Sequence, residues 1–144
     1  MKTVNDILRI KGHAVWSTTP DATVYEALKA MAEKNVGALV VLDADTVVGI
    51  VSERDYARKV ILHGRSSREI QVREIMTTEV YYVRPEQNIQ ECMAEMTEKR
   101  VRHLPALENG KLVGVISIGD VVKAVIADHE STIKHLEDYI TGGR

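Results

Sequence analysis

The chain has 144 residues, of which 44% are hydrophobic and 28% are charged, and its formal net charge is -2. This composition is typical of a soluble globular protein, excludes intrinsic disorder as the main state and gives no support to a general nucleic-acid binder. No apolar run approaches the ~20 residues of a membrane span, no signal peptide opens the chain, and the single Cys92 excludes a disulfide framework and a cysteine-based zinc site. We therefore expect a cytoplasmic protein of one domain, or of two very small ones.

The predicted elements follow one order twice along the chain. The first set is an extended segment ending at Pro20, a helix capped by Thr23, a strand at 37–42, a turn at 43–45, a strand at 47–51 and a helix beginning near Ser52. The second set repeats it with an extended segment ending at Pro85, a helix capped by Asn88, a turn at 108–110, a strand at 112–116 and a helix beginning near Ser117.

This order reflects an internal repeat. Residues 15–61 align with residues 80–126 without a gap, and about 15 of the 47 aligned positions are identical. A weaker match precedes each copy, at 4–8 and at 72–76, and three extra residues follow it in the first copy. The chain therefore consists of two tandem copies of one unit.

One β-α-β-β-α unit has too little core to be stable alone. We predict an α+β fold (α/β-like) in which two tandem units pack as one pseudo-twofold module, followed by a C-terminal helix. The predicted boundaries are residues 1–70 for the first unit with its N-terminal lead segment, 71–127 for the second unit, and 128–144 for the helix and tail.

The tail departs from the repeat. Residues 128–140 have a helical pattern with Ile133, Leu136 and Ile140 on one face and Tyr139 beside them. This helix either packs on its own module or forms a subunit contact.

The motif Ser-x-x-Asp occurs where the last strand of each copy runs into a helix, as Ser52 to Asp55 and as Ser117 to Asp120. In one interpretation it is structural, because Ser is a good N-cap and an Asp at N3 favours the helix dipole. In the other it binds a nucleoside phosphate, because a helix N-terminus attracts phosphate and a carboxylate can accept hydrogen bonds from a ribose diol. The two interpretations are compatible.

The repeat, the β-α-β-β-α order and the Gly-h-h-Ser-x-x-Asp ends, where h is an apolar residue, resemble a tandem pair of CBS domains, also called a Bateman module. The resemblance covers nearly the whole chain, from about Val4 to Ala127. It implies a regulatory protein that senses the energy or redox state of the cell by binding adenosine nucleotides. AMP, ADP and ATP are the expected ligands, and NAD or S-adenosylmethionine are alternatives.

The resemblance also implies the binding residues. Asp55 and Asp120 would hold ribose, while Ser52 and Ser117 would face phosphates. Each cleft would also use strands of the opposite copy, which puts Arg102 and His103 beside the Asp55 cleft and Gly37 and Ala38 beside the Asp120 cleft. Met76, Thr77 and Thr78 would line the adenine of the Asp55 cleft, and residues 8–13 would do so for the Asp120 cleft.

The two predicted clefts differ in charge. Arg54, Arg102 and His103 would clamp phosphate in the Asp55 cleft. The Asp120 cleft has Gly119 in place of Arg54 and no basic arm from the first copy, where Gly37 and Ala38 stand. We therefore expect unequal sites. The structural alternatives are a partly buried histidine for His103 and a solvated surface charge for Arg102.

We predict no catalytic residue and no metal site, because the sequence holds no recognisable catalytic or metal-binding motif. The expected partners are the nucleotide, a second copy of the chain and an unidentified effector protein, with no nucleic acid and no membrane. The dimer contact would use the first helix of each copy or the tail helix. The alternatives are an interaction protein with empty clefts and a small nucleotide-hydrolysing enzyme using Asp55 and His103.

Overall fold

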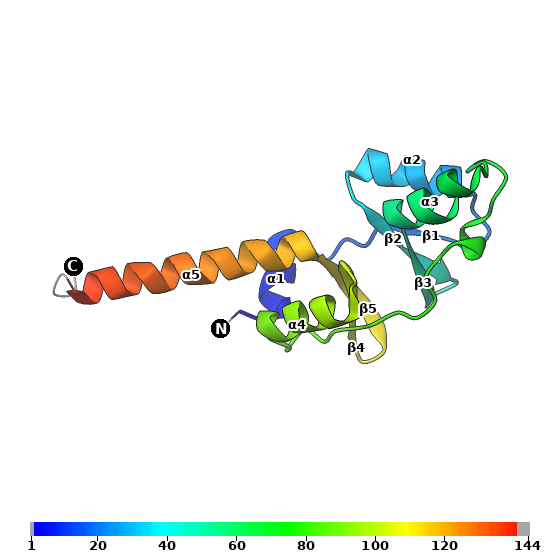
Figure 1. Ribbon diagram of the computed structural model, residues 1–144. Coiled ribbons are helices and arrows are strands. Elements are labelled where there is room, and N and C mark those ends of the chain that lie inside the picture. Colours follow the sequence, from blue (N-terminus) through cyan, green and yellow to red (C-terminus); the bar gives the residue numbers. More distant parts are fainter. Residues whose placement is uncertain (1, 141–144) are drawn as a thin grey trace. The chain divides into compact units, whose positions relative to one another are not determined.

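The computed structural model describes residues 2–140 and divides the chain into two compact units (Figure 1). Val15–Tyr81 forms one unit, which contains the first repeat and is called the first-repeat unit below. Met1–Ala14 and Tyr82–Arg144 together form the other, the second-repeat unit. The chain therefore leaves the second-repeat unit after its first residues and returns to it after completing the other unit.

The first-repeat unit has the predicted β-α-β-β-α order. Its elements are β1 (Ser17–Thr18), α2 (Val24–Lys34), β2 (Ala38–Asp43), β3 (Thr46–Ser52), α3 (Glu53–Lys59) and the 3-10 turns η1 (Ile61–His63) and η2 (Val72–Glu74). The strands form a sheet in the order β1-β2-β3, with β1 parallel to β2 and β2 antiparallel to β3.

The second-repeat unit follows the same plan with one difference. Its elements are α1 (Val4–Lys11), α4 (Ile89–Lys99), β4 (His103–Glu108), β5 (Lys111–Ser117) and α5 (Ile118–Ile140). β4 and β5 form an antiparallel pair, but the predicted extended segment before Pro85 makes one isolated parallel bridge, between Val83 and Ala106, in place of a strand.

Pro105 explains this difference. In the first repeat the Val40 amide donates to the carbonyl of Trp16, next to β1. Pro105 occupies the position of Val40 in the second repeat and has no N–H to donate. The pairing is therefore limited to Val83, whose amide donates to the Pro105 carbonyl at 2.9 Å.

The predicted helix caps are confirmed in both repeats. The Thr23 hydroxyl accepts a hydrogen bond from the Glu26 amide at 3.0 Å, and the Asn88 side chain accepts one from the Glu91 amide at 2.9 Å. Each cap satisfies an amide that has no partner within its helix. The capping residues therefore fix where α2 and α4 begin.

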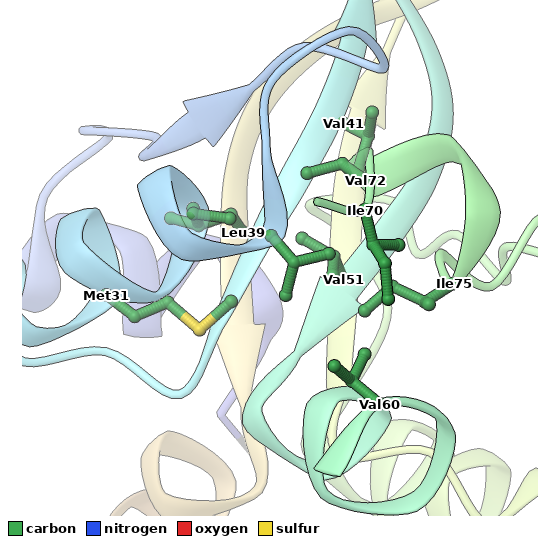
Figure 2. Close-up of a cluster of buried hydrophobic side chains, with 10 residues drawn as sticks. Met31, Leu39, Val41, Val51, Val60, Ile70, Val72 and Ile75 are labelled. Carbon is green, nitrogen blue, oxygen red and sulfur yellow. The ribbon is translucent and has the colours of Figure 1, made fainter. Parts of the chain in front are cut away.

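The core of the first-repeat unit lies between α2, the sheet and the segment that follows α3 (Figure 2). Met31, Leu39 and Val51 meet there with Val72 and Ile75, and none of these is more than 2% exposed. Burying an aliphatic side chain of this size contributes about 1.5–3 kcal/mol. We call the stretch that precedes each aligned copy its lead segment, which is residues 2–14 for the first repeat and 72–79 for the second. Val72 and Ile75 belong to the lead segment of the second repeat, so that segment completes the core of the first.

In the same way, the lead segment of the first repeat packs into the second-repeat unit. The Val4 amide donates to the Gln87 carbonyl at 2.9 Å, as the Val72 amide donates to the Ala22 carbonyl at 2.8 Å in the other unit. Leu8 of α1 is fully buried. The two repeats thus exchange their lead segments, with matching hydrogen bonds on both sides.

The repeat extends to backbone irregularities. Asn35 and Arg100 end α2 and α4 in the left-handed conformation, with φ of 54° and 55°. Ala44 and Asn109 take the same conformation in the two hairpin turns, with φ of 55° and 52°. The predicted turns at 43–45 and 108–110 are therefore confirmed.

The predicted tail helix is part of a longer helix. α5 runs from Ile118 to Ile140 without a break and projects beyond α1 and α4 (Figure 1). No glycine or proline lies between Asp120 and Ile140, so nothing in the sequence ends the helix at the repeat boundary. The side chains of Tyr139 and Ile140 lie outside the described residues. No helix within residues 2–140 combines the length and the hydrophobicity needed to cross a membrane.

Candidate functional site

The Ser52 to Asp55 motif forms a complete capping box at the start of α3. The Ser52 hydroxyl accepts from the Asp55 amide at 3.2 Å, and Asp55 Oδ2 accepts from the Ser52 amide at 2.9 Å and from its hydroxyl at 3.1 Å. The structural interpretation of the motif is therefore confirmed. Because a carboxylate has two oxygens and about four acceptor positions, this cap leaves room for further donors.

Lys59 provides a positive charge on the other oxygen of Asp55. Its Nζ lies 3.2 Å from Asp55 Oδ1 and donates to the Ile75 carbonyl at 2.8 Å. The Asp55 side chain is 13% exposed and the Lys59 side chain 46% exposed. The carboxylate is thus held in place while the ammonium group stays accessible to an anion.

The lead segment of the second repeat lies against β3 in this unit. Ile50 and Thr77 exchange two backbone hydrogen bonds, at 3.0 and 2.8 Å. Gly49 allows this approach, since a Cβ at that position would lie 2.9 Å from the Thr77 carbonyl oxygen and 2.9 Å from Met76 Sδ. The structure therefore places Met76 and Thr77 in the unit that contains Asp55, with Met76 half-buried and Thr77 and Thr78 exposed.

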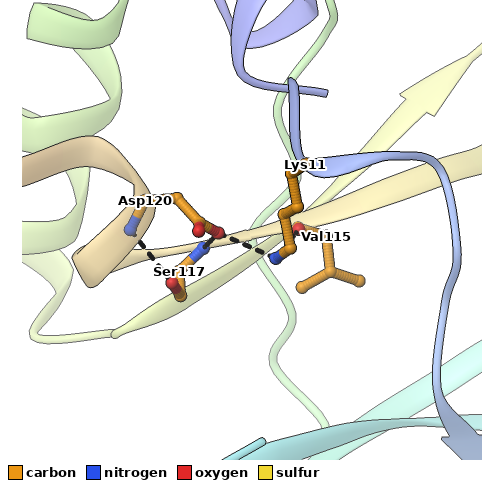
Figure 3. Close-up of polar contacts among 4 residues, drawn as sticks. All are labelled: Lys11, Val115, Ser117 and Asp120. Carbon is orange, nitrogen blue, oxygen red and sulfur yellow. Dashed lines mark hydrogen bonds and ion pairs between the residues drawn. The ribbon is translucent and has the colours of Figure 1, made fainter. Parts of the chain in front are cut away.

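The second motif forms the equivalent cap at the start of α5. Asp120 Oδ2 accepts from the Ser117 amide at 2.8 Å, and the Ser117 hydroxyl accepts from the Asp120 amide at 3.1 Å. Here the positive charge comes from Lys11, at the end of α1 (Figure 3). Lys11 Nζ donates to Asp120 Oδ2 and to the Val115 carbonyl, both at 2.7 Å.

Two side chains near this contact have shifted pKa values. Burial alone would raise the pKa of Asp120, but the hydrogen bonds from Lys11 and Ser117 outweigh it, so the pKa lies below the ordinary aspartate value. Burial lowers the pKa of His103, and the positive charge of Lys11 lowers it further. Asp120 is therefore ionised and His103 neutral at pH 7.

His103 and Arg102 belong to the second-repeat unit. His103 pairs with Ser117 across the β4–β5 ladder, and the Arg102 carbonyl accepts from the Ile118 amide at 2.8 Å. Gly37 has the same backbone role in the other unit, where its carbonyl accepts from the Glu53 amide at 3.1 Å. The Arg102 and Arg54 side chains are exposed and His103 is half-buried. Their role at the Asp55 cleft stays a prediction.

The expectation that the Asp120 cleft has no basic arm from the first copy is wrong, because a lysine that precedes that copy contacts Asp120. Lys11, from the lead segment of the first repeat, reaches Asp120 because the lead segments are exchanged. Lys59 was also missed as a site residue, although its i,i+4 spacing from Asp55 on one helix predicts contact. For Lys11 the signal was the family resemblance, which placed residues 8–13 beside the Asp120 cleft without singling out this side chain.

The capping box alone does not identify a binding site. Thr3 and Asp6 form the same box at the start of α1. The Asp55 and Asp120 boxes differ from it by a lead segment packed near a glycine of the preceding strand, Gly49 or Gly114. Their cations also lie closer, at 3.2 and 2.7 Å, than Arg9 does to Asp6, at 3.7 Å. A half-buried acceptor next to a partly exposed cation can bind a ligand that carries both hydroxyl and anionic groups.

Two further features of the described residues bear on their chemistry, namely the potential metal ligands and the Cys92 thiol. Among residues 2–140, no group of three or more His, Cys, Asp or Glu side chains is arranged to hold a metal ion. Cys92 is fully buried, and burial raises the pKa of its thiol to about 11. This thiol is a core residue, as its position on α4 predicted.

Comparison with known proteins agrees with the repeat. The family model described as CBS domain matches two segments of the chain, residues 3–62 and 72–127. These segments hold the Ser52–Asp55 and Ser117–Asp120 motifs.

Individual relatives span most of the chain. The mitochondrial CBS domain-containing protein CBSX3 of Arabidopsis thaliana is 42% identical, over 98% of this chain and 73% of its own length. The structure of a Burkholderia ambifaria protein with CBS domains, described as acting in signal transduction, has a TM-score of 0.85 at 56% identity and covers 88% of this chain and 96% of its own. A hexameric CBS-CP12 protein from bloom-forming cyanobacteria has a TM-score of 0.75 at 29% identity, over 85% and 70% of the two chains.

Proposed function

Because the chain belongs to the CBS domain family and carries two CBS domains in tandem, we propose that it is a regulatory protein that binds an adenosine nucleotide and signals to a separate effector protein. The observation that carries this proposal is the pair of capped carboxylates, Asp55 and Asp120, each in contact with a lysine ammonium group. A ribose diol supplies the hydroxyl donors that such a carboxylate can accept, and the lysine attracts the phosphate.

The charge of these sites favours a phosphorylated ligand. The exposed Arg54 lies on α3 with Lys59. Lys11 of α1 and the exposed Lys123 of α5 line the same pocket as Asp120. Cationic side chains attract the anionic phosphates of AMP, ADP, ATP or NAD and disfavour the sulfonium group of S-adenosylmethionine. AMP, ADP and ATP are therefore the proposed ligands, with NAD as the next candidate.

The Ser52 hydroxyl already donates to Asp55 Oδ2, so it would have to turn away from that oxygen to donate to a phosphate. Two amides at the start of α3 already have partners, because Glu53 donates to the Gly37 carbonyl and Asp55 donates to Ser52 itself. A phosphate that reached this helix end would compete for these amides. Most of the phosphate binding is therefore expected from Arg54 and Lys59 within this unit and from the predicted Arg102 and His103. Ser52 would add to it once its hydroxyl turns to the phosphate.

Calorimetry of AMP and ATP binding to Asp55→Ala tests the site. Loss of a charged acceptor should weaken binding by about 1–3 kcal/mol, which is roughly 5- to 150-fold in Kd. Asp43→Ala is the matched control, because Asp43 is an exposed carboxylate at the opposite end of the same hairpin. Equal affinities for the wild type and Asp55→Ala would contradict the assignment.

The remaining parts of the proposal are a homodimeric assembly, a cytoplasmic location and the lack of catalysis. Incubation with ATP and NAD separates a sensor from an enzyme, because turnover would favour hydrolysis by Asp55 and His103. A melting temperature unchanged by every nucleotide would favour an interaction protein with empty clefts. A sensor should instead be stabilised by the nucleotide without consuming it.

A further inference from the structure

The C-terminal half of α5 carries apolar side chains that have no core to enter. Among the described side chains of this helix, Val121 and Ala124 are buried, and both lie in its first two turns. Farther along, Ile126, Ile133 and Leu136 are 51%, 55% and 57% exposed. In proteins most of the stability of a helix comes from the packing of its apolar face, so this part of α5 would gain stability by packing on another surface.

These side chains follow the spacing of a coiled-coil seam. Val122, Ile126, His129, Ile133 and Leu136 are separated alternately by four and three residues, and the sequence continues the spacing to Ile140. Ile126 and Ile133 then occupy a positions of the heptad, and Val122, His129 and Leu136 occupy d positions. We call these five described residues the α5 seam.

The α5 seam is a different face from the one that packs on the second-repeat unit. Val122 follows the buried Val121 by one residue, which turns its side chain by about 100° around the helix. Val122 is 44% exposed as a result. The helix can therefore stay docked through Val121 and Ala124 while the seam contacts a second molecule.

We propose that the α5 seam pairs with the same seam of a second copy as an antiparallel two-stranded coiled coil. A twofold contact uses one patch on both molecules, and the alternating a and d residues make the seam self-complementary. Aligned around position 131, Ile126 faces Leu136 of the second copy and His129 faces Ile133 of the second copy. Each pair of facing residues across the two helices thus contains at least one aliphatic side chain.

Charge favours the antiparallel orientation. The e positions beside the seam hold Lys123, Glu130 and Glu137. An antiparallel pair brings e positions together, so Lys123 faces Glu137 of the second copy twice. Glu130 faces itself once, with Lys134 one turn away on the same helix to offset the repulsion. A parallel pair would place these residues beside g positions, which carry no charge in the sequence, and would set the two His129 side chains against each other.

Disulfide trapping in the full chain distinguishes the two orientations. Ile126→Cys mixed with Leu136→Cys should give a cross-linked dimer under mild oxidation, whereas neither variant alone should. Ser131→Cys mixed with Leu136→Cys is the control, since Ser131 is exposed on the side of α5 away from the seam. The native Cys92 is fully buried and gives the background. Cross-linking of each single variant with itself would mean parallel pairing, and a mixture no more cross-linked than the control would exclude the seam as an interface.

Sedimentation equilibrium of Ile133→Asp gives an independent test. The buried carboxylates should raise the dimer dissociation constant at least tenfold, whereas Ser131→Asp should leave it within about twofold. Ile133 is exposed within one chain, so circular dichroism and AMP binding should match the wild type and show that the variant folds. An unchanged dissociation constant would overturn the proposal.

Discussion

Lys11 and Lys59 bring an ammonium group to each motif carboxylate by different routes. Lys59 is four residues from Asp55 on the same helix, whereas Lys11 comes from a segment that precedes the first repeat. Ala124 takes the place of Lys59 in the second repeat, so the second site would have no cation of this kind without Lys11. The two sites therefore share a carboxylate and a cap but differ in where the cation approaches.

Replacing Lys11 should change the ionisation of Asp120. In Lys11→Met the carboxyl loses its nearest cation while its burial remains, so the pKa of Asp120 should rise. A carboxyl whose pKa is lowered by folding stabilises the folded state at pH values above its unfolded-state pKa, and this stabilisation is lost as the pH falls through the folded-state pKa. The stability of the variant should therefore differ from that of the wild type most near pH 7 and least in acid. NMR titration of the side-chain carboxyl measures the shift directly.

Lys59→Met is the matched control for that titration. Lys59 contacts Asp55 in the first-repeat unit, so its removal should leave the Asp120 midpoint unchanged. An Asp120 midpoint that does not move in Lys11→Met would show that the Lys11 contact does not hold the carboxylate in solution.

The Ser-x-x-Asp caps could be predicted from sequence, because capping is local and depends on residues three apart. Asp55 and Asp120 lie where the pattern placed them. The lysine at Asp120 does not follow from local spacing, since its contact spans more than a hundred residues. The family resemblance placed residues 8–13 beside Asp120 but did not single out Lys11.

Helices and strands follow the sequence pattern closely except where one residue overrides the repeat. The capped starts of α2 and α4 and the two hairpins agree with the predicted order. Pro105 prevents a full strand before Pro85, and the lack of a helix breaker after Asp120 joins the tail to α5. Both differences have causes in the sequence. The first depends on which strand pairs with the segment before Pro85 and the second on where α5 ends, and the repeat alone specifies neither.

Ala44 and Asn109 offer a test at the scale of a single turn. Both take the left-handed conformation, which Asn tolerates and which costs other L-residues roughly 1–2 kcal/mol. Ala44→Asn should therefore stabilise the protein by about 0.5–1 kcal/mol, measured by urea unfolding. The reverse change, Asn109→Ala, should destabilise it by a similar amount. Opposite signs would show that side-chain contacts, and not backbone strain, dominate these turns.

At the scale of the whole molecule, exchange of the lead segments links the two repeats. Each unit depends on buried residues from the lead segment of the other repeat. Leu8 fills this role in the second-repeat unit, and Val72 and Ile75 fill it in the first-repeat unit. A strand-to-helix junction where a nucleotide binds would therefore adjoin a segment contributed by the other repeat. A ligand can shift the assembly only by binding one arrangement more tightly than another.

The central claim is that the two capped carboxylates each hold an adenosine nucleotide, with unequal affinity. Native mass spectrometry of an AMP titration counts the bound molecules per chain in the wild type, in Asp55→Ala, in Asp120→Ala and in the double variant. The account predicts two binding steps at different concentrations in the wild type, loss of the tighter step in Asp55→Ala, loss of the weaker step in Asp120→Ala, and no specific binding in the double variant. AMP uptake by the double variant equal to that of the wild type would contradict it.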